Sequence, residues 1–497
     1  SGLSKEAFMQ QVPGLILAHN LHGIDIDLRA TQIAALALWL RAQRAYQEMG
    51  LKRNRPKITK SNIVCAEPMP GEENLLNEFI VELQPKVLGQ LLKVVFEKMK
   101  LAREAGSLLK IEDEIRDSII EARNQWKSLP KIEQLTLSPD FKDPKPEQFT
   151  IFDVTEISDE EFWNETENRL IDSLQKYAKQ AIGDQYLQRQ LFSNDAVQGF
   201  AFIDICRKQF DAVLMNPPFG LFFKEHFPWL KSKYPDSYVD IYSSFVARGL
   251  QLSQGKVGVI SPRSFLITPK LARHREKYVL QNLNVLLDLG EGVMDDATVL
   301  SCAYILDSIE LCENSIFPAF DRKSLEDKSN NLDRSVIFLD SNNTYLSDKR
   351  EIGRLQKTPI LYSLSSRILH TISSNEKLKD GVLIARSGLT TFNDFRFLRL
   401  RVEVDPKDIG ELKIWEPIAK GGTFSVFYSD LPLLIRWSTS GNEIAEENQR
   451  VNGQTAQARQ ASSYYRRFGG TYSYRSRKDF GVRVLPAGCI IGNKGPA

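Results

Sequence analysis

Residues 210–220 read FDAVLMNPPFG, and this stretch decides the fold class of the chain. An apolar run from Asp211 to Met215 predicts a buried strand, which continues directly into the tetrapeptide Asn-Pro-Pro-Phe at 216–219. At average composition such a tetrapeptide arises by chance in about one chain in a few hundred of this length. Open α/β sheets bind ligands at the carboxyl ends of their strands. The stretch therefore predicts an α/β fold with a ligand site directly after this strand.

The chemistry of the tetrapeptide suits recognition of an amine on an aromatic base. The nitrogen lone pair of such an amine is delocalised into the ring, so reaction at nitrogen requires acceptors that draw it toward sp³ geometry. The Asn216 side-chain oxygen and the Pro217 carbonyl can accept both amine hydrogens. The rings of Pro217 and Pro218 fix the backbone and aim that carbonyl, and Phe219 offers a face for an extruded base. The alternative interpretation is a tight turn without a chemical role.

The rest of the sequence alternates between strand and helix patterns. The first segment predicts a helix, a strand at HGIDID (22–27) and a second helix, followed by a short strand at NIVCAEP (62–68). Later strands are expected at FAFID (200–204), KVGVISP (256–262), NVLLDLG (284–290) and SCAYILD (301–307). Buried strands that alternate with helices predict a mostly parallel sheet covered on both faces.

Changes in composition divide the chain into four parts. Residues 1–71 and 196–345 carry the strand patterns and form the two halves of one α/β core. Residues 72–195 have apolar positions at helical spacing and predict a helical insertion. Residues 346–497 are a linker and an irregular region rich in Gly, Arg and aromatic residues, which we expect to be α+β. A domain boundary is expected between about residues 340 and 380.

Composition indicates a globular protein and narrows its partners. The 497 residues are 42% hydrophobic, and no apolar run approaches the roughly 18 residues of a membrane span, so we expect a cytoplasmic protein with no membrane contact. The five cysteines are not spaced like zinc ligands, so we expect reduced thiols and no metal. The net charge is only +2, but residues 441–497 hold nine Lys/Arg and four Asp/Glu, which favours this region as a nucleic-acid contact.

The Asn-Pro-Pro-Phe tetrapeptide resembles motif IV of the amino-methyltransferases, and two earlier stretches are similar to the cofactor motifs of the same family. HGIDID resembles the second motif, which implies that Asp25 holds the ribose hydroxyls of S-adenosyl-L-methionine and that Ile26 packs on its adenine. NIVCAEPM resembles the third motif, which implies that Glu67 accepts a hydrogen bond from the adenine amine. The family more often has Asp followed by an aromatic residue at that third position.

The remaining stretches resemble the later strands of the same domain and the start of a target-recognition region. DLGEGVMDDATVL (288–300) implies that Met294 lines the base pocket opposite Phe219. The segment YYRRFGGTYSYRSRK (464–478) interleaves cations with aromatic residues, as a DNA-facing surface does. The surface expected there consists of Arg466, Arg467, Tyr472, Tyr474, Arg475, Arg477 and Lys478. The alternative is a β-hairpin with packed tyrosines and solvated arginines.

The combined pattern is similar to the large adenine methylases of fused restriction-modification enzymes and of the BREX (PglX type) and DISARM phage-defence systems. This resemblance implies a Rossmann-like methyltransferase fold that uses S-adenosyl-L-methionine to methylate the N6 amine of a flipped adenine in double-stranded DNA. Other defence-system subunits are the further partners that it implies. The glycine-rich first motif has no counterpart in residues 1–20, so we expect a fragment of a longer protein. The alternatives are a methyltransferase acting on RNA or on a protein glutamine, and a non-catalytic subunit that binds DNA or a partner.

Overall fold

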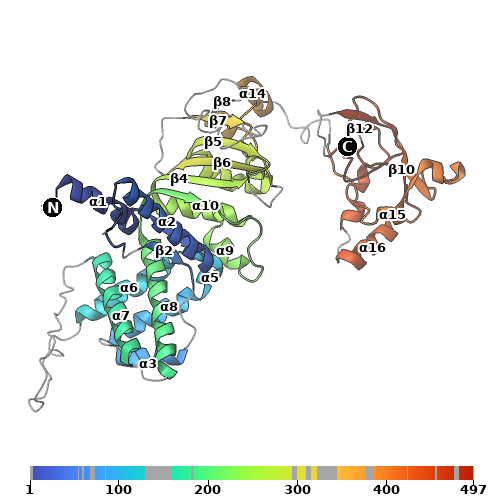
Figure 1. Cartoon of the computed structure of the whole chain (residues 1–497). Helices are drawn as coiled ribbons and strands as arrows, with labels where there is room; N and C mark the ends of the chain where they lie inside the picture. The colour runs from blue at the N-terminus through green and yellow to red at the C-terminus, as the bar shows by residue number, and fades with distance from the viewer. Residues whose placement is uncertain are drawn as a thin grey trace, which may run out of the picture. The chain divides into compact units, whose positions relative to one another are not determined.

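The computed structural model describes most of the chain as two compact units, residues 1–373 and 374–497 (Figure 1). The described residues are 4–53, 55–58, 61–67, 73–83, 86–128, 158–180, 184–293, 299–308, 315–321, 344–374, 384–422, 424–453, 456–474 and 481–495. Each unit has its own buried cluster of apolar side chains. The two units are therefore considered separately.

The first unit begins with a helix–strand–helix segment, as the sequence predicts. Helix α1 (Lys5–Leu15) continues into a π-helical turn, β1 (His22–Asp25) follows, and α2 (Leu28–Glu48) leads to β2 (Asn62–Cys65). The two strands pair in parallel, with Asp25 opposite Cys65 in the register. The last residues of both strands therefore lie side by side.

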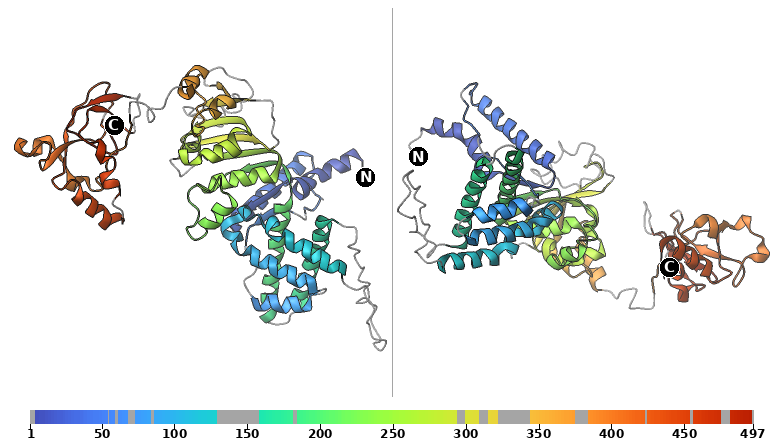
Figure 2. Two further views of the ribbon diagram at one scale, coloured as in Figure 1. Left: turned by 180° about the vertical axis from the view of Figure 1, so that it is seen from behind. Right: turned by 90° about the horizontal axis from the view of Figure 1, so that it is seen from below.

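A bundle of helices follows β2 (Figures 1 and 2). Its members are α3 (Glu73–Glu82), α4 (Lys86–Lys98), α5 (Ala102–Ala105), α6 (Ile111–Ser128), α7 (Asp159–Gln180) and α8 (Asp184–Arg207). The expected strand at 200–204 is wrong, because this stretch belongs to α8. Phe200, Phe202 and Ile203 are all fully buried there. A helix enclosed on several sides can carry alternating apolar residues that resemble a strand pattern.

The described residues of the first unit also form a sheet of six strands, in the order β3-β4-β6-β5-β7-β8. The strands are β3 (Phe210–Met215), β4 (Ser253–Pro262), β5 (Leu283–Gly290), β6 (Ser301–Asp307), β7 (Ile316–Asp321) and β8 (Thr344–Asp348). Strands β3 and β4 are parallel, but β6 runs antiparallel to both of its neighbours. The sheet is therefore mixed, and the expectation of a mostly parallel sheet is wrong.

Short and medium helices cover this sheet. They are α9 (Phe227–Lys233), α10 (Ile241–Leu252), α11 (Ala272–His274), α13 (Lys349–Gly353) and α14 (Ser366–Ser374). Tyr242 and Val246 of α10 pack in the same apolar cluster as Val257 and Val259 of β4. Helix α10 is thereby held against the sheet next to the strand that precedes the Asn-Pro-Pro-Phe tetrapeptide.

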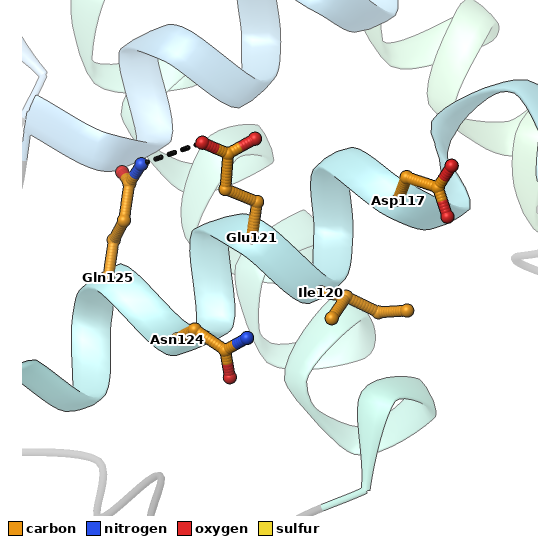
Figure 3. A pocket seen from close by; sticks show the side chains of 5 residues that line it. All are labelled: Asp117, Ile120, Glu121, Asn124 and Gln125. Carbon is orange, nitrogen blue, oxygen red and sulfur yellow. Dashed lines mark hydrogen bonds between the residues drawn. The ribbon is translucent and has the colours of Figure 1, made fainter.

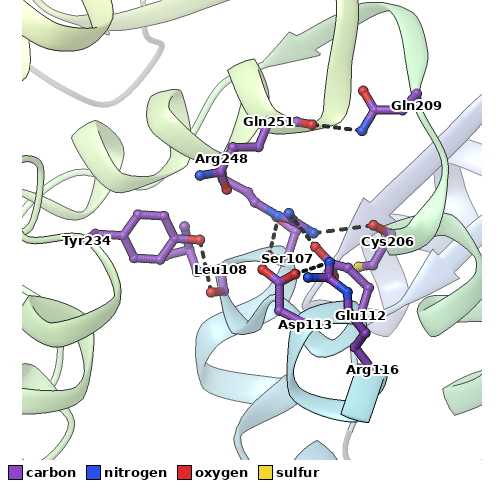
Figure 4. A network of polar contacts seen from close by, with 10 residues as sticks. All are labelled: Ser107, Leu108, Glu112, Asp113, Arg116, Cys206, Gln209, Tyr234, Arg248 and Gln251. Atoms are coloured by element: carbon purple, nitrogen blue, oxygen red, sulfur yellow. Dashed lines mark hydrogen bonds and ion pairs between the residues drawn. The ribbon is translucent and has the colours of Figure 1, made fainter. Parts of the chain in front are cut away.

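A buried arginine joins α10 to the helical bundle (Figure 4). Arg248 donates from Nε to the Ser107 carbonyl at 2.8 Å and forms an ion pair from Nη1 to Glu112 Oε1 at 2.6 Å. It also donates from Nη2 to the carbonyl of Cys206, near the end of α8, at 3.4 Å. Charged side chains stay buried when they are paired and hydrogen-bonded. Arg248 thus connects α10 to three parts of the helical bundle.

The second unit contains a small sheet of order β14-β10-β11-β9 and a separate hairpin among its described residues. The sheet strands are β9 (Leu398–Leu400), β10 (Trp415–Ala419), β11 (Leu433–Arg436) and β14 (Ile490–Ile491). Strands β12 (Gly469–Tyr472) and β13 (Val482–Leu485) pair antiparallel as the hairpin, and the helices include α15 (Asp394–Phe397) and α16 (Asn442–Asn452). This unit has the expected α+β character.

Candidate active site

The Asn-Pro-Pro-Phe tetrapeptide lies at the carboxyl end of β3. Asn216 is exposed directly after the strand, whereas the Pro217 ring is buried beneath it. Phe219 is half-buried and meets the Tyr242 ring of α10 edge-on, with 6.3 Å between ring centroids. The buried proline and the packed aromatic hold the loop, so the Asn216 side chain is presented to solvent from a fixed backbone.

Asp240, which immediately precedes α10, is hydrogen-bonded to the residue that follows the tetrapeptide. The Gly220 N–H donates to Asp240 Oδ1 at 2.9 Å, and the Ile241 N–H donates to the Gly220 carbonyl at 2.9 Å. Gly220 has φ of +107°, a conformation that residues with a Cβ rarely adopt. Burial raises the pKa of Asp240, and hydrogen bonds from backbone N–H groups, Gly220 first among them, oppose the rise. No local pattern in the sequence indicates a role for Asp240.

The expected cofactor residues lie together at the ends of β1 and β2. The Ala66 N–H donates to the Asp25 carbonyl at 2.8 Å, which extends the parallel pairing past the strand ends toward Glu67. Asp25 and Ile26 are exposed, with 51% of the Ile26 surface accessible. Asp25 Oδ1 accepts a hydrogen bond from the Asp27 N–H at 2.8 Å, which fixes the carboxylate at the strand end. Two carboxylates and one exposed apolar side chain therefore share one edge.

Cys65 lies between these carboxylates and takes part in the same polar group. Burial raises the pKa of its thiol to about 11, with further contributions from Glu67, Asp25 and Asp27. Its thiol donates to the Ile26 carbonyl at 3.7 Å. The thiol is consequently neutral at physiological pH and has a structural role in holding the turn after β1.

Strands β1 and β3 begin next to each other. The rings of His22, at the start of β1, and Phe210, at the start of β3, have centroids 5.2 Å apart. The structure thus brings the strand carrying Asp25 beside the strand that leads into Asn216.

A cavity of about 420 Å³ opens at the carboxyl end of β4. Its walls include Leu266, Ile267 and Leu300, and Arg263 and Tyr362 supply the polar groups. Arg263 Nε pairs with the buried Asp288 Oδ2 at 2.6 Å, and the Tyr362 hydroxyl donates to the same oxygen at 2.5 Å. Since β3 and β4 are adjacent parallel strands, this largely apolar cavity and Asn216 belong to the same edge of the sheet.

A second hollow, of about 510 Å³, lies on the surface of α6 and has a different character (Figure 3). Asp117, Ile120, Glu121, Asn124 and Gln125 line it, all from one helix, and Gln125 Nε2 donates to Glu121 Oε1 at 3.1 Å. The hollow lies on the helical bundle and not at the strand ends. We assign it no part in the site.

The structure divides the residues expected to face DNA. Arg466 is not free to do so, because its Nε and Nη2 bind the two oxygens of Glu416 at 2.9 and 2.7 Å. Glu416 is completely buried, so this pair stabilises the unit, contrary to the expectation for Arg466. Arg467 is exposed and lies over the Tyr464 ring at 5.4 Å.

Only β12 of the hairpin β12–β13 lies within this segment, because β13 begins at Val482. Tyr472 ends β12 and is half-buried, and Tyr474 is 64% exposed. Four expected site residues, Met294, Arg475, Arg477 and Lys478, lie outside the described residues.

Two further observations concern the described residues alone. Among the described residues, no group of three or more His, Cys, Asp or Glu side chains is arranged to hold a metal ion. The described helices also include none with the length and hydropathy required to cross a membrane.

Comparison with known proteins identifies relatives across this site. The model of the Eco57I restriction-modification methylase family matches residues 19–292, which include the two cofactor strands, the helical bundle and the tetrapeptide. The adenine-specific methyltransferase PglX of Lacticaseibacillus casei (strain Zhang) is 23% identical over 310 residues, covering 58% of this chain and 26% of that protein. The adenine-specific methyltransferase BrxX of Escherichia coli O9:H4 (strain HS) is 23% identical over 512 aligned residues, covering 98% of this chain and 37% of that protein. The chain thus spans about a quarter to a little over a third of these relatives.

The chain is also similar to solved structures of restriction-modification proteins, at low identity and low TM-score. The type IIL restriction-modification enzyme MmeI in complex with DNA has a TM-score of 0.42 and 10% identity, covering 99% of this chain and 57% of that one. The type IIG restriction endonuclease BpuSI has a TM-score of 0.29 and 12% identity, covering 58% of this chain and 41% of that one.

Proposed function

Because the chain belongs to the Eco57I restriction-modification methylase family, we propose that it is the methyltransferase part of an adenine-specific DNA methylase of a restriction-modification or phage-defence system. The reaction places a methyl group on the exocyclic N6 amine of an adenine turned out of double-stranded DNA. The observation that carries this proposal is the exposed Asn216 on a buttressed loop at the carboxyl end of β3.

In this proposal Asn216 and Pro217 orient the amine. The Asn216 side-chain oxygen and the Pro217 carbonyl accept one hydrogen bond each from the amine hydrogens. Both acceptors draw the nitrogen lone pair out of conjugation with the ring, and neither is consumed as a base. Pro218 restricts the backbone after the carbonyl, and Phe219 offers part of a ring face to the base. The buried Pro217 ring and the Phe219 contact with Tyr242 support this role, because they remove the cost of ordering the loop in each turnover.

The residues at the ends of β1 and β2 fit the cofactor that the family implies. S-adenosyl-L-methionine, when bound, supplies the methyl group. The Asp25 carboxylate suits the two ribose hydroxyls, and Glu67 suits the adenine amine, since each is an acceptor for a donor. The exposed Ile26 side chain offers the apolar surface on which an adenine ring packs. Met294 is proposed to line the base pocket opposite Phe219.

The test is methyl transfer by the full-length protein to duplex DNA, with RNA and protein as competing substrates. We expect transfer to adenine in DNA, and a loss of about 10² to 10³ in rate for Asn216→Ala. Asn282→Ala is a matched control, because its amide donates to the Tyr278 carbonyl at 3.0 Å, away from the tetrapeptide. Normal turnover by Asn216→Ala would remove this residue from the site. Transfer to RNA or protein alone would replace the proposed substrate.

A further inference from the structure

The second unit contains a cavity of about 740 Å³, most of whose lining residues have a polar or charged side chain, here called the polar cavity. Its walls carry hydroxyl, amide and ammonium groups and the backbone of two consecutive glycines. The side chains in its lining that carry donor groups include Ser387, Thr390, Lys420, Asn493 and Lys494. All of the lining residues belong to residues 374–497, so the cavity is a property of this unit alone.

Two lysines meet at the polar cavity because they follow neighbouring parallel strands. Ala419 of β10 pairs with Ile491 of β14, and the chain continues from these strands to Lys420 and Lys494 respectively. The Lys420 side chain is only 9% exposed, and its Nζ donates to Thr391 Oγ1 at 2.9 Å and pairs with Asp394. Lys494 is exposed. Burial lowers the pKa of Lys420, opposed by Asp394, and Lys494 lowers it further. The cavity therefore concentrates positive charge that one carboxylate only partly balances.

Glycine is required where the chain leaves β10. Gly421 and Gly422 have φ of +83° and +133°, and a Cβ on Gly421 would lie 2.6 Å from the Lys494 carbonyl oxygen. These two residues bring bare backbone to the cavity wall between the lysines. Within the described residues, neither of their backbone N–H groups takes part in a hydrogen bond to another backbone group. They can donate to a ligand.

The hydrogen-bond donors that line the polar cavity favour an anionic ligand. Lysine ammonium groups, serine and threonine hydroxyls, asparagine amides and backbone N–H groups are the donors that proteins use for DNA phosphate oxygens. The cavity is large enough for a phosphodiester with its adjacent sugars. We propose that the polar cavity binds a backbone phosphate of double-stranded DNA, with Lys494 and Lys420 as its charged ligands. This proposal rests on the proposed function.

The experiment measures duplex DNA binding by the full-length protein at several salt concentrations. Each phosphate contact releases counterions, so Lys494→Ala should reduce the slope of log affinity against log salt by about 0.9. Lys494→Arg should retain the slope, because the charge remains. Lys413→Ala is the matched control, since Lys413 is an exposed lysine of the same unit outside the cavity lining. Thr390→Ala, which removes one hydroxyl donor without a change of charge, should weaken binding with the slope unchanged.

Three outcomes decide the proposal. A loss of slope in Lys494→Ala and not in Lys413→Ala supports it. Equal slopes in wild type and Lys494→Ala overturn it. A titration with dAMP and with inorganic phosphate covers the other source of a phosphoryl group. Binding of either that depends on Lys494, together with an unchanged DNA slope, would assign the cavity to a free anion and also overturn the proposal.

Methyl transfer at saturating DNA separates this proposal from the proposed function. Lys494→Ala should raise the KM for DNA and leave kcat unchanged. If the wild type methylates DNA but Lys494→Ala has the same salt slope of DNA binding as the wild type, only the assignment of the polar cavity fails. If Lys494→Ala shows the expected decrease in salt slope but the wild type methylates no adenine, only the proposed function fails.

Discussion

Asp240 and Gly220 are twenty residues apart in sequence and are joined by a 2.9 Å hydrogen bond from the Gly220 N–H to Asp240 Oδ1. Together with the bond from the Ile241 N–H to the Gly220 carbonyl, this bond pairs both backbone polar groups of Gly220 with the start of α10. The base-facing loop is therefore anchored to the start of α10, a helix that is itself packed on the sheet. We propose that Asp240 is a positioning residue for Asn216, which acts through this loop and not by contact with a base.

Asp240→Ala should lower kcat for DNA methylation by about 10-fold, the equivalent of a hydrogen bond to a charged group of about 1.5 kcal/mol. Asp240→Asn should retain most activity, because its side-chain oxygen accepts the same bond. KM for DNA and cofactor affinity should change little. Asp236→Ala is the control, since Asp236 pairs with Lys277 on the surface at 2.7 Å. Equal losses of activity in Asp240→Ala and Asp240→Asn would contradict the positioning role.

Asp25→Ala should weaken S-adenosyl-L-methionine binding by about 1 to 3 kcal/mol, because a charged acceptor for two hydroxyls is lost. Titration calorimetry of the full-length protein measures this directly. Asp27→Ser is the matched variant: it removes a neighbouring carboxylate but can still cap α2, where Asp27 Oδ1 accepts from the Arg29 N–H at 2.8 Å. Unchanged affinity in Asp25→Ala would exclude Asp25 from the cofactor site.

The proposed site residues that the sequence predicted are those with local signals, but the expectation of a buried strand before them is wrong, because Leu214 of β3 is 84% exposed at the edge of the sheet. The strand end, the rigid prolines and the exposed Asn216 are adjacent in sequence, and Asp25 directly ends a short strand. The Asp240 contact spans twenty residues and the Arg466–Glu416 pair spans fifty, so neither leaves a pattern that a single sequence displays. The antiparallel direction of β6 could not be predicted either, because the alternation of strands and helices in a sequence does not show which way a strand runs.

Arg248→Met should destabilise the first unit strongly. The substitution leaves Glu112, which is largely buried, without its ion-pair partner, and breaking such a pair costs about 3 to 5 kcal/mol. Chemical unfolding followed by tryptophan fluorescence measures the loss. Arg116→Met is the control, because its ion pair with Asp113 is largely exposed and is worth about 0 to 1 kcal/mol. Adding Glu112→Gln to Arg248→Met should recover part of the stability. A loss no larger than that of the control would show that the pair does not hold α10 to the bundle.

His274 makes the first unit sensitive to acid. It is completely buried, and burial lowers its pKa from 6.5 to about 3, with a smaller contribution from Arg275. The folded protein therefore resists protonation that the unfolded chain accepts, so stability is full above pH 6.5 and falls as the pH drops toward 3. The loss at the acid end is on the order of 5 kcal/mol.

His274→Met removes this titration and should flatten the dependence of unfolding free energy on pH between 6.5 and about 3. His370→Gln is the control, because His370 is exposed on α14. Thermal unfolding at a series of pH values provides the comparison. A slope in His274→Met as steep as in wild type would place the acid sensitivity elsewhere.

Arg466 and Arg467 are adjacent in sequence and should respond to mutation in opposite ways. Arg466→Ala leaves the fully buried Glu416 carboxylate unpaired, so it should lower the stability of the second unit by about 3 to 5 kcal/mol. Arg467 is exposed over the Tyr464 ring, so Arg467→Ala should change stability by about 0.5 kcal/mol or less. If Arg467 contacts a DNA phosphate, its loss should reduce the salt slope of DNA binding by about 0.9. Unfolding and salt-dependent binding measured on the same two variants separate the roles: a stable Arg466→Ala would refute the structural pair, and an unchanged slope in Arg467→Ala would remove this arginine from the DNA-facing surface.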